Sequence, residues 1–261
     1  MNIHTFKQRK SDRQKISMVT CYDHWSAKIL NETEVDCILV GDSLAVVMHG
    51  FDSTVHATLE MMELHVAAVA RGATDKFIIA DMPFMSCSKG LEHAMTAVQR
   101  LMQAGANAVK IEGDAHNELI RHIVAAGVPV MGHLGLTPQS IHNLGGHRVQ
   151  AKSEAEAARL IEAARGLEAA GCFAVVLECV PVKLGGCVAH AVSIPTIGIG
   201  AGPHTDGQVL VLQDLLGVNP DFVPRFLRVY ANGHDVLKNA VNHYHADVVE
   251  RAFPSLKESY K

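Results

Sequence analysis

The amino-acid sequence predicts an α/β protein, specifically a (β/α)8 TIM barrel with an N-terminal capping helix and C-terminal helices. Short apolar runs alternate with stretches of helical periodicity along most of its 261 residues. This is the pattern of βα units around a parallel sheet. Eight such runs fit a closed barrel better than an open sheet, and barrels of this size commonly form one domain. We therefore expect residues 1–261 to form a single (β/α)8 barrel domain.

Each predicted strand is a short apolar run bounded by turn-forming residues. Runs of this kind indicate strands that are buried on both faces of a parallel sheet. The predicted strands are Ile16–Thr20, Cys37–Val40, Phe77–Ala80, Ala108–Ile111, Pro129–Gly132, Phe173–Leu177, Thr196–Ile199 and Val209–Leu212.

Stretches of helical periodicity fill most of the intervals between these strands. Three of them run into glycine at the joint with the next strand, at Gly105, Gly127 and Gly171. Glycine there supplies the left-handed residue that commonly ends a helix. The predicted helices are Trp25–Asn31, Leu59–Ala70, Leu91–Ala104, Asn117–Ala126 and Glu154–Ala170.

The two ends of the chain depart from this alternation. A first helix, Thr5–Lys10, is predicted to cap the closed end of the barrel. Only about ten residues separate the seventh and eighth strands, fewer than a βα unit usually needs, so we expect a shortened seventh unit. After Asn219, the prolines Pro220 and Pro224 and two helical patterns predict terminal packing rather than a second domain.

The composition narrows the class of protein. Hydrophobic residues make up 48% of the chain, and the formal net charge of −4 gives no electrostatic case for binding nucleic acid or an anionic membrane. Residues 1–13 are polar and basic, without the apolar core of a signal peptide, and nothing resembles a membrane span. The six cysteines show no CxxC spacing, so we expect reduced, mostly buried thiols in a cytoplasmic protein rather than a zinc site.

Four of the apolar runs lead into an acidic residue, namely Asp42, Asp81, Glu112 and Glu178. They lie 39, 31 and 66 residues apart, or roughly one, one and two βαβ units of about thirty residues. Each acid is therefore expected at the C-terminal end of its strand, the face that carries the active site in such barrels. Because gathered carboxylates resist ionisation, a positive group should lie among them.

Three of these acids, Asp42, Asp81 and Glu112, form a candidate metal trio. Two aspartates and a glutamate without a histidine cluster match the oxygen ligands that Mg²⁺ prefers. Each acid alone also has a structural interpretation: Asp42 suits a helix N-cap or a turn, and Asp81 precedes Met82-Pro83, which enforces an extended exit. Their occurrence together favours the metal site.

Lys110 precedes Glu112 by two positions, so both side chains face the same side of the strand. A lysine directed into a barrel must be paired with an anion. One interpretation is an internal ion pair with Glu112 or Asp81, and the other is binding of a substrate carboxylate. A Schiff-base role is disfavoured, because neighbouring acids raise the pKa of a lysine and keep it protonated.

Two further residues are candidates for the same rim. Glu178 suits a general base, with an ion pair to an arginine as the open alternative. His133 also lies at the end of a strand and is a possible site-lining residue. The glycine-rich run Gly198–Gly202 lacks a phosphate-loop motif, which favours close backbone packing at the barrel mouth.

At these residues the chain resembles the ketopantoate hydroxymethyltransferase family. That resemblance implies a barrel of the phosphoenolpyruvate mutase and isocitrate lyase type, usually a homodecamer. The chain departs from the family pattern at two places. One is Lys183 with the Gly185-Gly186 pair, whose glycines weaken the helix expected there, and the other is His56. The matching segments are Thr20–Asp23, Val40–Ser43, Asp52–Thr54, Ala80–Phe84, Val109–Gly113, Gly132–Gln139, Leu177–Pro181, Ile197–Gly202 and Thr205–Gln208.

The resemblance also implies roles for individual residues. It implies one Mg²⁺ per subunit held by Asp42, Asp81 and Glu112, and Glu178 as the proton acceptor. The 2-oxo acid substrate would be bound by Asp42, Ser43, Asp81 and Lys110.

By the same resemblance, the reaction transfers a one-carbon unit from 5,10-methylenetetrahydrofolate to 3-methyl-2-oxobutanoate, giving 2-dehydropantoate for pantothenate and coenzyme A synthesis. The residues by themselves support metal-assisted enolisation of a 2-oxo acid. One alternative is another Mg²⁺-dependent 2-oxo acid lyase or mutase of the same superfamily, for which Cys87 would be the reactive cysteine, although no KKCGH-like stretch surrounds it. The other is a non-enzymatic protein that binds a metal and an oxo acid.

Overall fold

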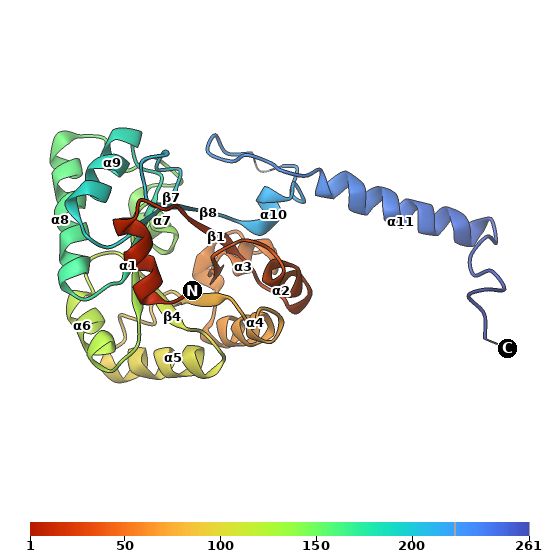
Figure 1. The fold of residues 1–261 in the computed structure, drawn as a ribbon, viewed down its shortest axis with the longest axis horizontal. Helices are drawn as coiled ribbons and strands as arrows, with labels where there is room; N and C mark the ends of the chain where they lie inside the picture. Colours follow the sequence, from red (N-terminus) through yellow and green to blue (C-terminus); the bar gives the residue numbers. More distant parts are fainter. Residues whose placement is uncertain (222, 261) are drawn as a thin grey trace. The chain divides into compact units, whose positions relative to one another are not determined.

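The computed structural model describes residues 1–221 and 223–260. The chain forms two compact units, Met1–Leu210 and Val211–Lys261. In the first unit, eight parallel strands close into a barrel in chain order, with β8 paired to β1. Helices surround this barrel, as Figure 1 shows, so the predicted fold class is confirmed. The grouping of all 261 residues into one domain stays a prediction.

The strands fall close to their predicted positions. Three match at both ends, and four others differ by one to three residues at one end or at both. The last strand lies two residues earlier than predicted. The observed strands are β1 (Ile16–Thr20), β2 (Cys37–Val40), β3 (Phe77–Asp81), β4 (Ala108–Glu112), β5 (Val130–Gly135), β6 (Ala174–Glu178), β7 (Thr196–Ile199) and β8 (Gly207–Leu210).

The helices of the first unit include the six that the sequence predicts by range, the helix expected at the Gly185-Gly186 pair, and several short ones that it does not predict. The unpredicted helices mostly follow strands at the C-terminal end of the barrel. The helices are α1 (Ile3–Ser11), α2 (His24–Asn31), α3 (Leu44–Val47), η1 (Thr54–His56), α4 (Leu59–Gly72), α5 (Leu91–Gln103), α6 (Asn117–Ala125), η2 (Pro138–Ser140), α7 (Ile141–Leu144), α8 (Glu154–Ala169) and α9 (Val182–Ala191).

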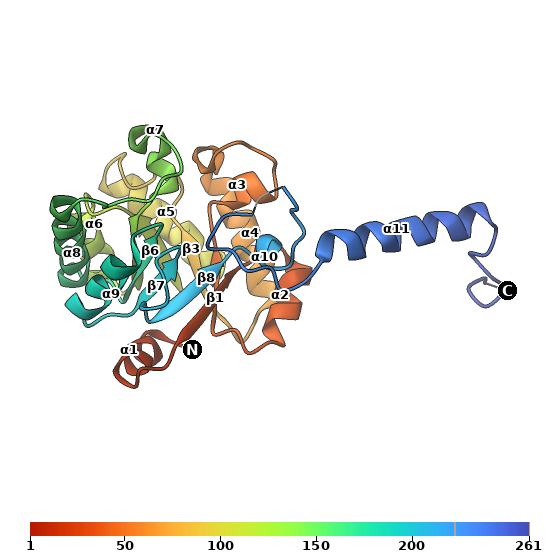
Figure 2. The same cartoon turned by 90° about the horizontal axis from the view of Figure 1, so that it is seen from above.

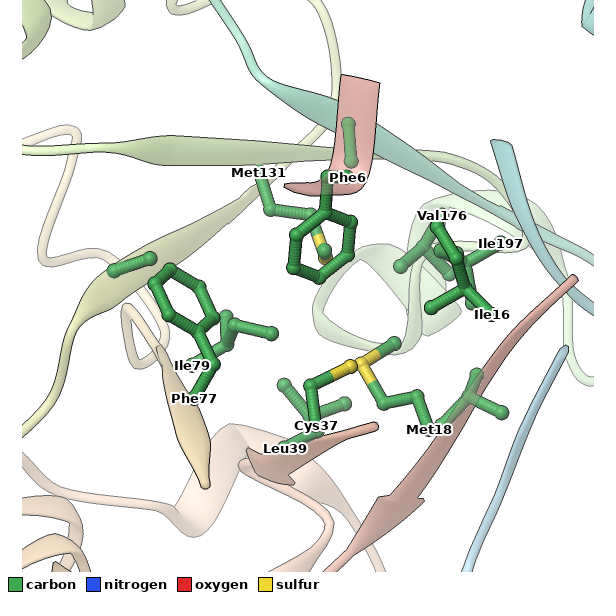
Figure 3. Close-up of a cluster of buried hydrophobic side chains, with 13 residues drawn as sticks. Phe6, Ile16, Met18, Cys37, Leu39, Phe77, Ile79, Met131, Val176 and Ile197 are labelled. Carbon is green, nitrogen blue, oxygen red and sulfur yellow. The ribbon is translucent and has the colours of Figure 1, made fainter. Parts of the chain in front are cut away.

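The end of the barrel where the strands begin is filled by apolar side chains. Phe6, on α1, is fully buried, and its ring lies 5.7 Å from that of Phe77 and 5.1 Å from that of Phe173. Figure 3 shows Phe6 among Met131, Ile79 and other inward side chains of the strands. The first helix therefore closes this end, as the sequence predicts.

The seventh unit is shortened as predicted, because β7 leads to β8 without a helix between Ile199 and Gly207. The preceding helix, α9, forms over ten residues despite its glycine pair. A side-chain carbon at Gly185 would collide with the backbone oxygen of Ala201. This glycine is therefore a packing requirement of α9, and it lets the helix approach the turn after β7.

The opposite end of the barrel carries the short helices that follow the strands. Figure 2 shows α3 and α7 at this end and α1 at the other. On β3 and β4 the inward-facing side chains change from apolar to charged towards the C-terminal end of the barrel. Phe77 and Ile79 are followed by Asp81, and Ala108 is followed by Lys110. The strands thus deliver charged side chains into the C-terminal mouth.

The second unit contains α10 (Leu212–Leu215) and α11 (Gly233–Val249). No residue of α11 is buried. Within residues 1–221 and 223–260, no helix combines the length and apolar character that crossing a membrane requires.

Candidate active site

Asp81 is the last residue of β3, and its carboxylate is bound from two sides. The backbone N–H of Asp42, two residues beyond β2, donates to Asp81 Oδ2 at 3.0 Å. The ammonium of Lys110 lies 2.8 Å from Asp81 Oδ1, and both side chains are only 4% exposed. The ends of β2, β3 and β4 are thereby joined through one buried carboxylate.

The hydroxyl of Ser43 has room beside Asp81 because residue 41, two positions before it, is a glycine. A side-chain carbon at Gly41 would lie 2.8 Å from Ser43 Oγ and 3.4 Å from an oxygen of Asp81. Ser43 Oγ is 2.7 Å from the hydroxyl of Tyr22, which is fully buried. Burial raises the pKa of Tyr22, so its phenol stays protonated and fixes the orientation of Ser43.

Lys110 remains charged within the barrel. Burial lowers its pKa, but the charges of Asp81, Glu112 and Asp42 outweigh that effect and raise the pKa above its usual value. The ammonium is also 3.1 Å from Nδ1 of His133. The internal ion pair that was one interpretation of Lys110 is therefore present, and its partner is Asp81.

His133 lies between two of the acids. Its Nδ1 is 3.2 Å from Glu112 Oε1, and its Nε2 is 3.2 Å from Glu178 Oε2. Burial and Lys110 lower its pKa, but the bonds to Glu112 and Glu178 prevail and raise the pKa to about 9. For Glu112, burial raises the pKa, whereas the contact with His133 leads the effects that lower it overall.

The end of β6 holds Glu178 in a constrained backbone. The N–H of Leu136 donates to the Glu178 carbonyl at 2.8 Å, and only a glycine fits at position 135 (φ +93°), because a side chain there would collide with that carbonyl. Cys179 follows with φ 49°, a left-handed conformation that costs energy for a non-glycine residue. The ion-pair partner of Glu178 is His133 and not the arginine of the open alternative.

One residue of the mouth was not predicted as a site residue. Gln139, in η2, donates from its side-chain nitrogen to Asp42 Oδ2 at 2.8 Å and to the Met82 carbonyl at 2.9 Å. Its backbone N–H donates to Glu112 Oε2 at 3.1 Å. Two sequence signals mark this loop: Pro138 stands at the start of a helical turn, and the family-matching segment Gly132–Gln139 ends at Gln139.

The three acids of the proposed metal trio interact electrostatically, because the charges of Asp81 and Glu112 both act on Asp42. Burial, followed by the charges of Asp81 and Glu112, raises the pKa of Asp42 well above its ordinary value, so the carboxylate would gain from a nearby cation. Asp81 Oδ1 is buried, and the Lys110 ammonium 2.8 Å away is a single positive charge facing the three carboxylates. The donor set and these two observations fit a divalent cation with oxygen ligands. Among the described residues, no three His, Cys, Asp or Glu side chains already converge in a ligand geometry.

The remaining sequence alternatives are also placed. Asp42 does not cap a helix, because the N-cap of α3 is Ser43, which makes no side-chain cap bond. Cys87 lies in the loop after β3 and is partly buried, and burial raises the pKa of its thiol to about 11. An elevated thiol pKa disfavours a reactive cysteine at this position.

Comparison with known sequences gives consistent matches along the chain. The family described as "Ketopantoate hydroxymethyltransferase" matches residues 1–256. A 3-methyl-2-oxobutanoate hydroxymethyltransferase of Coxiella burnetii is 56% identical over 259 residues, covering 98% of this chain and 97% of the relative. The enzyme of that name from Bdellovibrio bacteriovorus is 56% identical over 256 residues, with the same two coverages. That from Francisella tularensis subsp. novicida is 51% identical over 256 residues, again covering 98% and 97%.

Solved structures share the fold at low sequence identity. Phosphonopyruvate hydrolase in complex with oxalate and Mg²⁺ has a TM-score of 0.63 and 12% identity, covering 99% of this chain and 93% of that chain. A 2,3-dimethylmalate lyase of the PEP mutase/isocitrate lyase superfamily has a TM-score of 0.58 and 15% identity, covering 96% and 98%. At this level of sequence identity, these likenesses show a shared fold and nothing about function.

Proposed function

Because the chain belongs to the ketopantoate hydroxymethyltransferase family, we propose that it transfers a hydroxymethyl group to 3-methyl-2-oxobutanoate and so forms 2-dehydropantoate for pantothenate biosynthesis. The observation that carries this proposal is the family match over residues 1–256, together with 56% identity to curated enzymes of this activity. The one-carbon donor in the proposal is 5,10-methylenetetrahydrofolate, with water as the further reactant and tetrahydrofolate as the second product.

In this proposal Asp42, Asp81 and Glu112 hold one Mg²⁺. The burial of Asp42 and its mutual repulsion with the other two acids support a cation at this spot. When bound, a divalent cation polarises the keto group of a 2-oxo acid and stabilises the negative charge of its enolate.

Lys110 binds the substrate carboxylate in this scheme. Its ammonium is buried and charged, which suits an anion and disfavours attack on the keto group as a free amine. Ser43, held by Tyr22, offers a hydroxyl for a substrate oxygen, and Asp42 and Asp81 complete the proposed substrate contacts.

Glu178 is the proposed general base. Its carboxylate is 18% exposed and therefore accessible from the mouth, and the contact with His133 keeps it oriented. Glu178 takes the proton from C3 of the oxo acid, and the resulting carbon nucleophile bonds to the methylene carbon of the folate. Both C–N bonds of that carbon break, water supplies the hydroxyl group of the product, and the two folate nitrogens take up the C3 proton and a proton of the water to give tetrahydrofolate. A base positioned in this way contributes about 10²–10⁴-fold to the rate.

A homo-oligomer is also part of the proposal, with a decamer expected from the family. The second unit supports self-association because α11 exposes a row of apolar side chains at alternating spacings of four and three. The row is Leu237, Val241, Tyr244 and Val248. Such a row suits packing against another helix.

We also propose a cytoplasmic location, which accords with six free cysteines and with the metabolic role.

A single assay separates this function from its alternatives. Purified protein is incubated with methylenetetrahydrofolate, Mg²⁺ and a panel of 2-oxo acids, and products are followed by NMR. The expected result is 2-dehydropantoate from 3-methyl-2-oxobutanoate, dependent on the folate and lost with EDTA. Cleavage or rearrangement of another oxo acid without folate would instead indicate the lyase or mutase. No turnover with any substrate would indicate the non-enzymatic binding protein.

A further inference from the structure

The hydrogen bonds of Gln139 reach the ends of three strands at the mouth. Its side chain contacts Asp42 beyond β2 and Met82 beyond β3, and its backbone contacts Glu112 at the end of β4. Two of these partners are acids of the proposed cation site. The proposed mechanism gives Gln139 no role, although two of its hydrogen bonds go to these acids.

The chemistry of these contacts fixes how the amide is oriented. Asp42 Oδ2 and the Met82 carbonyl are both acceptors, so the atom that faces them must be the amide nitrogen, with one N–H for each. The nitrogen thus places two positive hydrogens beside a carboxylate that is 3% exposed and repelled by its neighbours. One oxygen of Asp42 is held, and the other stays available as a ligand.

The loop that carries Gln139 is itself fixed, so the amide acts from a defined position. The backbone N–H of Ser140 donates to the Thr137 carbonyl at 2.8 Å, and Pro138 begins the η2 turn. Gln139 is partly buried. A side chain on a free surface loop would not bridge two strand ends at 2.8 and 2.9 Å.

We infer that Gln139 is a positioning residue that orients the carboxylates of Asp42 and Glu112 for a divalent cation. The side chain holds Asp42 Oδ2 and the backbone N–H holds Glu112 Oε2, so both carboxylates are already oriented before a cation binds. Groups that orient metal ligands in this way typically change metal affinity about 10–100-fold when they are removed. This inference rests on the cation site of the proposed function.

The test measures binding of Mn²⁺ alone, without oxo acid or folate, by the loss of the free-ion EPR signal during titration. Gln139→Met keeps the length of the side chain and the backbone N–H to Glu112 but removes both amide donors. We expect its dissociation constant for Mn²⁺ to rise about 10–100-fold. Gln139→Asn, which keeps an amide but is one methylene shorter, should also bind Mn²⁺ more weakly and serves if the methionine variant does not fold.

A matched control is available on the same barrel. The amide of Gln208 donates to the Gly202 carbonyl at 2.9 Å and to Thr205 Oγ1 at 2.8 Å, and neither partner is an acid of the site. Gln208→Met should therefore bind Mn²⁺ as the wild type does. Thermal unfolding of each variant in cation-free buffer shows whether it is folded at the titration temperature.

The outcomes separate the inference from the cation site itself. If wild type binds Mn²⁺ and the folded Gln139 variants bind it equally or more tightly, the positioning role is wrong and the cation site stands. A lower melting temperature with unchanged Mn²⁺ affinity would show a merely structural role and also overturn the inference. If wild type binds no Mn²⁺, both the site and the role of Gln139 are wrong.

Discussion

The two ends of the barrel are built by the same strands but differ in what they contribute. On β3, the inward residues Phe77 and Ile79 belong to the apolar cluster of the closed end, and Asp81, two positions further, belongs to the charged mouth. Because side chains alternate along a strand, one inward face supplies both. Two positions along the strand therefore separate the apolar part, which stabilises the fold, from the charged part, which we propose performs the chemistry.

The two ends differ in how much their side chains contribute to the free energy of folding. Each large apolar side chain buried at the closed end contributes about 1.5–3 kcal/mol. At the mouth, Asp81 and Lys110 form a buried ion pair, and pairs of this kind are often no more stable than apolar residues of similar size. The charged end is therefore best explained by function, and substitutions at the two ends should separate activity from stability.

The largest effect is expected from Glu178→Gln. The amide keeps the shape of the carboxylate but cannot accept the C3 proton, so kcat should fall about 10²–10⁴-fold while the melting temperature stays close to that of wild type. Glu162→Gln, at an exposed ion pair on α8, is the control and should change neither quantity. A Glu178→Gln enzyme with wild-type kcat would remove Glu178 from the chemistry.

The converse is expected from Phe6→Ala at the closed end. Loss of this fully buried ring from its contacts with Phe77 and Phe173 should reduce the free energy of unfolding by about 3–5 kcal/mol. Chemical denaturation measures this quantity. At a temperature where the variant is folded, its kcat should match wild type, and a large fall in kcat there would show that the two ends are not separable.

A smaller effect is expected from Tyr22→Phe, which removes the hydroxyl that contacts Ser43 Oγ at 2.7 Å. Loss of one hydrogen bond costs about 1 kcal/mol, so KM for the oxo acid should rise roughly fivefold, with little change in kcat. Steady-state kinetics test this expectation. A variant with unchanged KM would show that the orientation of Ser43 does not depend on Tyr22.

The smallest expected effect is a difference between the alkylation rates of buried and exposed cysteine thiols, measured without any substitution. Cys37 lies in the apolar cluster of the closed end and Cys172 is also buried; burial raises the pKa of both, that of Cys172 to about 12. Cys187, on α9, is exposed. At pH 8, iodoacetamide should modify Cys187 first and leave the two buried thiols intact until the protein unfolds, as mass spectrometry would show. Early modification of Cys37 would contradict a tightly packed closed end.

Much of the fold and of the site follows from strand periodicity. The apolar runs place Asp81, Lys110, Glu112 and Glu178 at or near strand ends, because the period of two determines which side chains face inward. The role of Ser43 needed the family resemblance, whereas the cation trio was predicted from the three acids themselves. The structure shows how these side chains contact one another, but their assignment as ligands and base remains a prediction.

The features that the sequence did not predict depend on contacts between distant segments. Gln139 and Tyr22 lie in loops, where no periodicity marks the direction of a side chain. The start of β8 was missed because Gly207-Gln208 lacks an apolar pattern, although a side-chain carbon at Gly207 would collide with the Ile16 carbonyl. The stability of α9 likewise depends on close packing at Gly185, which helix propensity does not describe.

The most direct test of the charged mouth is exchange of the C3 hydrogen of 3-methyl-2-oxobutanoate in D₂O, followed by NMR without folate. Wild type with Mg²⁺ should exchange this hydrogen, because Glu178 removes the proton while the enolate is stabilised. Exchange should fall to the uncatalysed rate with EDTA and by about 10²–10⁴-fold in Glu178→Gln. Undiminished exchange by the Glu178→Gln protein, or by wild type in EDTA, would contradict cation-assisted enolisation at these acids.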